Sequence, residues 1–102
     1  MRLSEKGQTI IKKTFAEVFP AGDRLWLFGS RVDDTKKGGD IDLYIETNLE
    51  NHEDSRKLKI TFWSKLQLRL GEQRIDIVIK SLKKNESLPI YEEARRTGII
   101  LV

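Results

Sequence analysis

Two stretches decide the fold, LWLFGSR at residues 25–31 and GDIDLYI at residues 39–45. The first is an apolar run closed by a glycine and a serine, which predicts a buried strand that ends in a turn. In the second, three apolar residues alternate with three polar or aromatic ones: Ile41, Leu43 and Ile45 with Asp40, Asp42 and Tyr44. Strict alternation predicts a second strand with one apolar face and one face that carries aspartates.

The flanking sequence predicts helices around these strands and one further strand. Residues 4–19 and 51–70 carry apolar side chains at helical spacing, and Gly71 is a plausible stop for the second of these helices. Residues 74–80 repeat the Ile-Asp-Ile pattern around Asp76 and predict a third strand. A last helix is expected at residues 90–97, and the apolar tail 99–102 should pack on the core or serve a partner surface. The prediction is an α/β (α+β) fold with a small mixed β-sheet flanked by helices.

Composition sets limits on the kind of protein. The 102 residues suit one domain, 1–102, and the lack of cysteine excludes disulfides and thiolate metal sites. No segment resembles a signal peptide or a membrane span, so we expect a cytoplasmic protein without membrane contact. The net charge of +3 is compatible with polyanionic substrates but does not require them.

The aspartates are the strongest candidates for chemistry. Asp40 and Asp42 are two residues apart on one strand, so their side chains share a face at a separation of roughly 7 Å. If the third strand lies alongside, Asp76 completes a cluster of three carboxylates. Protonation, basic neighbours or a hard divalent cation could relieve their repulsion. Mg²⁺ prefers such oxygen ligands, and two ions could serve both the attacking and the leaving group of a phosphoryl transfer.

The turn after the first strand predicts a phosphate site. Gly29 permits close approach of the backbone, Ser30 offers a hydroxyl and an N–H, and Arg31 can pair with phosphate oxygens. Each motif alone is weak, because an Asp-x-Asp pair and a Gly-Ser turn are ordinary surface features. Their occurrence in this order, with Asp76 in a third apolar strand, favours a nucleotide site.

Three segments resemble the signature of the nucleotidyltransferase superfamily related to DNA polymerase beta: LFGSR at 27–31, GDIDLYI at 39–45 and RIDIVI at 74–79. Within that superfamily, the short length and EEARRTGI at 92–99 resemble the minimal nucleotidyltransferases. Those proteins are commonly encoded beside a HEPN-domain protein and act as the antitoxin of a toxin–antitoxin pair.

The resemblance implies a role for each matching position. Gly29 and Ser30 would bind the triphosphate, and Arg31 would contact its phosphates. Three carboxylates would be metal ligands and catalytic residues, with the third activating the acceptor hydroxyl: Asp40, Asp42 and Asp76. It further implies ATP as donor, two Mg²⁺ ions, and transfer of AMP to a tyrosine hydroxyl of the HEPN partner, which would block its RNase activity.

Several alternatives stay open on the sequence alone. The chain could be an antitoxin that masks its partner by contact without catalysis, or it could modify a small molecule in a pocket shared with another subunit. Tyr44 could stack on a base or pack under the sheet, whereas Trp26 and Trp63 are expected in the core and His52 at an exposed helix start. Four basic residues could form a solvated face, a partner surface or an RNA contact: Lys83, Lys84, Arg95 and Arg96. Homo- or hetero-oligomers are both possible.

Overall fold

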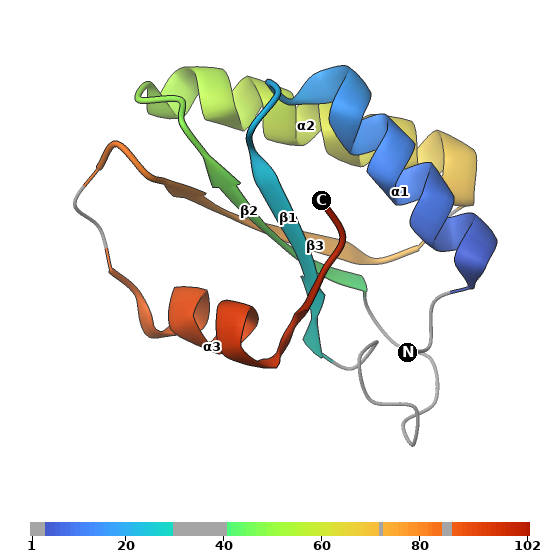
Figure 1. The fold of residues 1–102 in the computed structure, drawn as a ribbon. Coiled ribbons are helices and arrows are strands. Elements are labelled where there is room, and N and C mark those ends of the chain that lie inside the picture. The colour runs from blue at the N-terminus through green and yellow to red at the C-terminus, as the bar shows by residue number, and fades with distance from the viewer. Residues whose placement is uncertain (1–3, 30–40, 72, 85–86) are drawn as a thin grey trace.

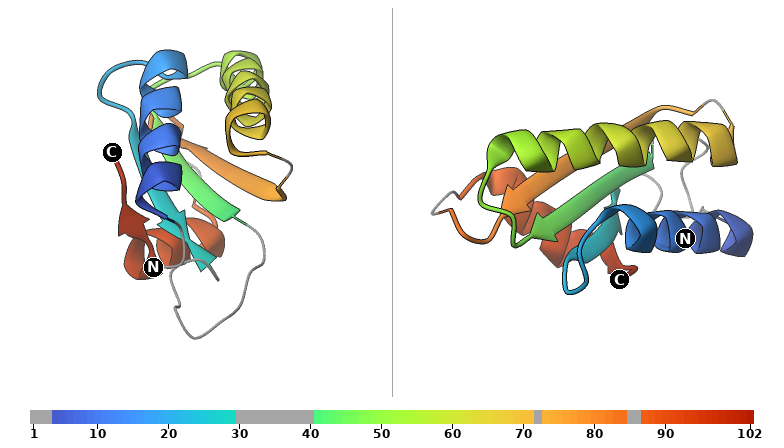
Figure 2. Two further views of the ribbon diagram at one scale, coloured as in Figure 1. Left: turned by 90° about the vertical axis from the view of Figure 1, so that its right-hand side faces the viewer. Right: turned by 90° about the horizontal axis from the view of Figure 1, so that it is seen from above.

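The computed structural model describes residues 4–29, 41–71, 73–84 and 87–102. Their helices and strands are α1 (Glu5–Val18), β1 (Arg24–Phe28), β2 (Ile41–Thr47), α2 (His52–Leu70), β3 (Ile75–Ser81), α3 (Pro89–Thr97) and β4 (Ile99–Ile100). The strands form one sheet in the order β3-β2-β1-β4. Helices α1 and α2 cover one face of this sheet and α3 covers the other (Figures 1 and 2).

The helices begin where their first residues can be capped. Ser4 Oγ accepts a hydrogen bond from the Gly7 N–H at 3.0 Å, and Asn51 Oδ1 accepts one from the Glu53 N–H at 2.8 Å. Pro89 opens α3, where its missing N–H costs nothing because the first helical turn has no internal acceptor. All three predicted helices are therefore confirmed within about one residue at each end.

Pairing in the sheet is mixed, as the sequence predicts. β2 runs antiparallel to β1 and parallel to β3. The tail forms a short strand that the sequence analysis did not predict, because β4 contains only Ile99 and Ile100 and runs antiparallel to β1. This pairing continues beyond β4, since the Leu25 N–H donates to the Val102 carbonyl at 3.1 Å.

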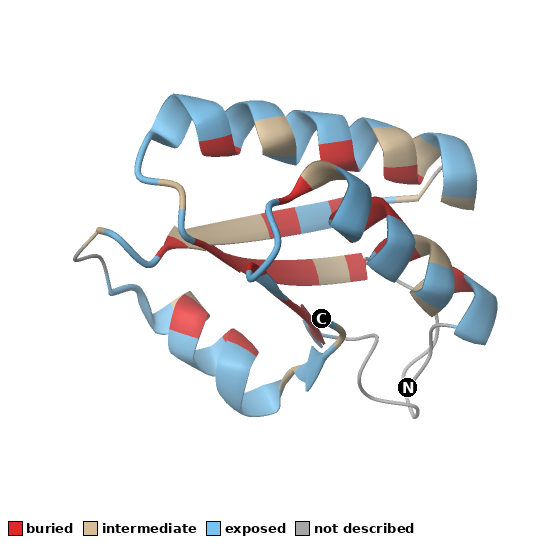
Figure 3. Cartoon of the chain, turned by 45° about the horizontal axis from the view of Figure 1, so that its top comes forward, coloured by how far each residue is buried: buried red, intermediate tan, exposed pale blue. Residues whose placement is uncertain are grey.

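Two apolar clusters hold the layers together, and Figure 3 shows their buried residues along the strands and the inner sides of the helices. The larger lies under α1 and α2 and includes the fully buried Phe62 and Leu66. The smaller lies under α3 and consists of aromatic residues and one alanine: Trp26, Phe28, Tyr44, Tyr91 and Ala94. Trp26 is in the core as predicted, but the prediction for Trp63 is wrong. Trp63 is 44% exposed because it follows Phe62 by one residue, about 100° around the helix.

A buried polar contact joins the start of β1 to the end of β2. Asp23 is 3% exposed, and its carboxylate accepts from the Thr47 hydroxyl at 2.6 Å and from the Asn48 N–H at 3.2 Å. Each carboxylate oxygen thus accepts a hydrogen bond from the protein, as a buried polar group requires. Of the helices in the described ranges, none is long and apolar enough to cross a membrane.

Candidate functional site

Two of the predicted carboxylates lie side by side at one end of the sheet. β2 and β3 are parallel, and their register pairs Asp42 directly with Asp76. Residues paired in this way point to the same face, and here that face is the one covered by α3, because Phe28 pairs with Asp42 from the other side. Asp76 is exposed and Asp42 is half-buried. The expectation that the third strand lies alongside the second is confirmed.

The glycine after β1 lies against one of these carboxylates. Gly29 has a φ of +78°, a conformation that L residues with side chains rarely adopt. A Cβ at this position would lie 3.0 Å from Asp42 Cγ and closer still to Oδ2. Glycine is therefore required here for two reasons: it allows the turn, and it leaves the space beside the Asp42 carboxylate open. The fold thus brings together Gly29, Asp42 and Asp76.

Three other predicted site residues, Ser30, Arg31 and Asp40, lie outside the described residues, so their roles stay predictions. Within the described ranges, no three histidine, aspartate or glutamate side chains are close enough together to hold a metal ion. The third carboxylate that the sequence predicts for such a site is Asp40, which directly precedes Ile41 of β2 in the chain.

Tyr44 occupies the next position along the same face and is fully buried. Its ring lies between those of Trp26 and Tyr91, with centroids 5.2 and 5.8 Å away. Its hydroxyl donates to Glu46 Oε2 at 2.8 Å. Burial, followed by this hydrogen bond to a carboxylate, raises the pKa of Tyr44 well above its ordinary value. Of the two interpretations left open for Tyr44, packing under the sheet agrees with the structure.

Glu46 is a structural residue that the sequence analysis missed. It is 5% exposed, and its Oε2 lies 3.4 Å from Nε of Arg95 on α3. The Arg95 guanidinium also lies over the Trp26 ring, 5.7 Å from its centroid. The alternation that places Asp42 and Tyr44 on the α3 face continues to Glu46, so the signal was present in the sequence. Arg95 thus fastens α3 to the sheet while part of its side chain is exposed.

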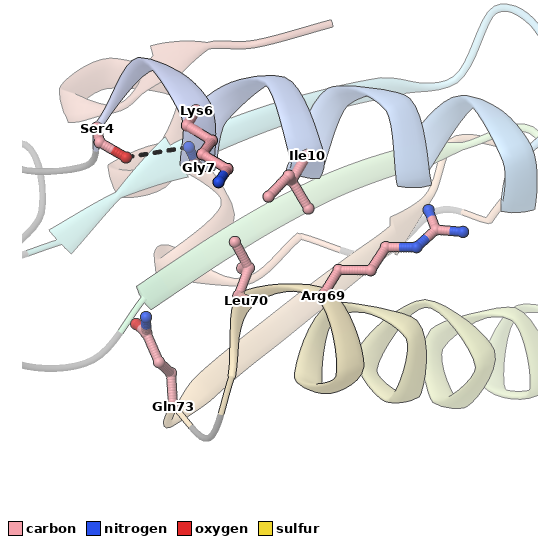
Figure 4. Close-up of a pocket in the computed structure, with 7 residues that line it drawn as sticks. All are labelled: Ser4, Lys6, Gly7, Ile10, Arg69, Leu70 and Gln73. Carbon is pink, nitrogen blue, oxygen red and sulfur yellow. Dashed lines mark hydrogen bonds between the residues drawn. The ribbon is translucent and has the colours of Figure 1, made fainter.

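Two of the hollows are lined mainly by helix residues of the described chain. One, of about 490 Å³, runs along α3 and is lined by Glu92, Arg95 and Arg96 among the described residues. The other, of about 280 Å³, lies between the start of α1 and the end of α2 (Figure 4). Two of its polar side chains have partners within the protein: Ser4 caps α1, and Arg69 donates to Thr14 Oγ1 at 2.9 Å. His52, at the start of α2, is exposed as expected.

Comparison with known families agrees with this geometry. The sequence profile of a family described as nucleotidyltransferase domain matches residues 9–99 of the chain. This range runs from α1 into β4 and includes all the predicted site residues. A four-stranded mixed sheet flanked by three helices in the described residues is consistent with the fold of polymerase beta-like nucleotidyltransferases. No curated protein matches the chain.

Proposed function

The chain belongs to the nucleotidyltransferase domain family, and from that premise we propose that it transfers AMP from ATP to a hydroxyl group on a protein. The observation that carries the proposal is the pairing of Asp42 with Asp76 across parallel strands, with Gly29 directly against Asp42. Two carboxylates and an open backbone turn at one sheet end are suited to a triphosphate with its cation.

The donor set fits a hard divalent cation. The site offers carboxylate oxygens, and the chain contains no cysteine. There is also space beside the Asp42 carboxylate, because Gly29 lacks the Cβ that would fill it. Two Mg²⁺ ions would be held by three carboxylates, those of Asp40, Asp42 and Asp76. When bound, Mg²⁺ supplies neutralisation of the charge that develops on the phosphates.

The residues of the chain have separate tasks in the proposed reaction. Gly29 and Ser30 hold the triphosphate through backbone N–H groups and the serine hydroxyl, and Arg31 pairs with phosphate oxygens. The acceptor oxygen forms a bond to the α-phosphorus while the bond from that phosphorus to pyrophosphate breaks. The proton of the acceptor hydroxyl passes to the Asp76 carboxylate, which is exposed to an incoming acceptor. Orientation of the two reactants provides much of the rate.

For the acceptor we propose a tyrosine hydroxyl of a HEPN-type RNase, whose toxicity the modification would block, so that the chain acts as an antitoxin. The support for this acceptor is the resemblance of residues 92–99 to the minimal nucleotidyltransferases. In the structure this segment comprises the last six residues of α3, Gly98 and the first residue of β4.

The test is transfer of label from ATP carrying ³²P at the α-phosphate, with Mg²⁺, into the proteins of a source-cell lysate. Wild type is compared with Asp42→Asn and with Asp54→Asn, which removes an equally acidic but remote, exposed group on α2. We expect a labelled band with wild type and Asp54→Asn only, and mass spectrometry then identifies the acceptor. Retained labelling by Asp42→Asn would overturn the metal role of this residue.

A second function, inhibition of the partner by contact alone, is favoured by one observation. Apolar side chains at the C-terminal edge of the sheet are exposed: Ile99 by 37%, Ile100 by 46% and Val102 by 39%. A variant with Asp40, Asp42 and Asp76 all changed to Asn separates the two functions. If this variant neutralises the partner as fully as wild type does, catalysis is dispensable and contact is the mechanism.

A further inference from the structure

The junction between α3 and β4 packs unusually closely on the end of β1. Gly98 ends α3, and its N–H donates to the Ala94 carbonyl at 2.9 Å. A Cβ at Gly98 would lie 2.9 Å from the Leu27 carbonyl oxygen and 3.2 Å from Phe28 Cβ, and even closer to the Ala94 oxygen. The φ of Gly98 is −82°, which any residue adopts. Space, and not backbone conformation, therefore requires glycine here.

The strand residues that Gly98 contacts lead directly into the candidate site. Phe28 pairs with Asp42 in the sheet and immediately precedes Gly29. Gly29 in turn lies so close to Asp42 that no Cβ fits between them. A displacement of Phe28 by a few tenths of an ångström is thus transmitted to the turn through one peptide unit, whose geometry is rigid.

α3 is anchored to the sheet along its length, so it cannot easily retreat from β1. Tyr91 and Ala94 are buried against the sheet, and Arg95 reaches Glu46 and Trp26. In a close-packed interior, an added group between two neighbours must displace one of them, and it displaces the one that is held less firmly. With α3 anchored by these contacts, added volume at Gly98 is expected to move the end of β1.

We propose that Gly98 is a positioning residue, which sets the place of the Gly29 turn relative to Asp42 and thereby the affinity for the triphosphate. The proposal rests on the proposed function for its consequence in nucleotide binding. Its structural part is that added volume at Gly98 displaces Gly29 through the end of β1, and this part does not depend on what the site binds. Gly98 itself touches no reacting group in this scheme.

The experiment compares Gly98→Ala with Gly22→Ala. Gly22 lies before the opposite end of β1 and has a φ of +98°, and a Cβ there would meet no atom within 4 Å, so its substitution strains the backbone without pushing on a neighbour. Backbone amide NMR spectra and calorimetric titration with Mg·ATP are recorded for both variants and wild type. We expect Gly98→Ala to shift the Gly29 and Asp42 amide signals and to raise the Kd for Mg·ATP about tenfold or more. Gly22→Ala should do neither, even where it lowers the melting temperature equally.

Unchanged Gly29 and Asp42 signals in folded Gly98→Ala would overturn the proposal. So would equal changes in the two variants, because they would show a general effect of lost stability. If Gly98→Ala does not fold, Arg95→Ala releases α3 from Glu46 instead and should shift the same two amide signals; their constancy would overturn the proposal. Failure of wild type to bind any Mg·nucleotide would contradict the proposed function, whereas the amide shifts would still decide the role of Gly98.

Discussion

Among single residues, Gly29 meets two separate demands, a positive φ and a side-chain-free approach to Asp42. Gly71 meets only the first, with a φ of +85° and open space where a Cβ would lie. We expect Gly71→Ala to lower the free energy of unfolding by about 1–3 kcal/mol for backbone strain alone, because a φ of +85° with a ψ of 176° is open almost only to glycine. Gly29→Ala should cost more and should also weaken Mg·ATP binding, because its Cβ displaces the Asp42 carboxylate. Urea unfolding and titration measure both effects, and equal nucleotide affinities of the two variants would contradict the prediction.

Tyr44 predicts a specific loss of stability at alkaline pH. Its folded-state pKa is raised, by burial and by the bond to Glu46, above the unfolded value of about 10. The contribution of the neutral hydroxyl is therefore complete below pH 10 and is lost as the pH rises toward the folded-state pKa. Above pH 10, the unfolding free energy of wild type should fall more steeply than that of Tyr44→Phe, by up to about 1.4 kcal/mol per pH unit. The unfolding free energies of both proteins are measured by urea unfolding at pH 9 to 11. An equal fall with pH in wild type and Tyr44→Phe would contradict this prediction.

What could be predicted at the residue level depends on what a local pattern encodes. Alternation placed Asp42 and Tyr44 on the face opposite to Ile41 and Leu43, and the structure confirms this division. The pattern could not tell which element would cover that face. The burial of Tyr44 and the ion pair of Arg95 with Glu46 could not be predicted for that reason, because both depend on how α3 packs over the sheet.

For the secondary-structure elements, length decided what the sequence could predict. The three helices and three longer strands carry several turns or repeats of their period, and each was predicted. β4 has two residues, too few for a period, and it exists because β1 offers it an antiparallel partner. The parallel pairing of β2 with β3 likewise depends on the crossover through α2, which local sequence does not reveal.

The link between β1 and β2 predicts a second test at this scale. Asp23 is buried and accepts from Thr47 and Asn48, so Asp23→Ala leaves a buried hydroxyl and a backbone N–H without their acceptor. We expect it to lower the unfolding free energy by about 2–3 kcal/mol. Asp23→Asn, whose amide oxygen can still accept, should lose less. A change below about 0.5 kcal/mol for Asp23→Ala, the size of an ordinary surface substitution, would show that the contact is not formed in solution.

Considered as a whole molecule, the two faces of the sheet are unequally supported. Under α1 and α2, twelve buried apolar residues of the described chain form one cluster, which includes Phe15 stacked on Phe19 at 4.9 Å. Under α3, the buried cluster has five members. Since apolar burial provides most of the stabilisation of an element, α3 should detach in rare openings at a lower free energy than α1 and α2, although its contacts fix its place in the native state.

This inequality predicts an order of opening that hydrogen exchange can measure. The amides of α3 and β4 should exchange through a partial opening of lower free energy than those of β2, which lies between β1 and β3 in the sheet. Tyr91→Ala should speed exchange in α3 and in β2 by the same factor, because the contacts of Tyr91 are lost in the partial opening and in the global opening alike. Phe62→Ala should instead lower the global free energy of unfolding by about 3–5 kcal/mol and speed exchange in β2, while the partial opening of α3 changes little because Phe62 stays packed in it. If α3 and β2 exchange with equal free energies in wild type, the sheet and both helix layers open as one unit, and α3 then holds the end of β1 as firmly as the larger core does.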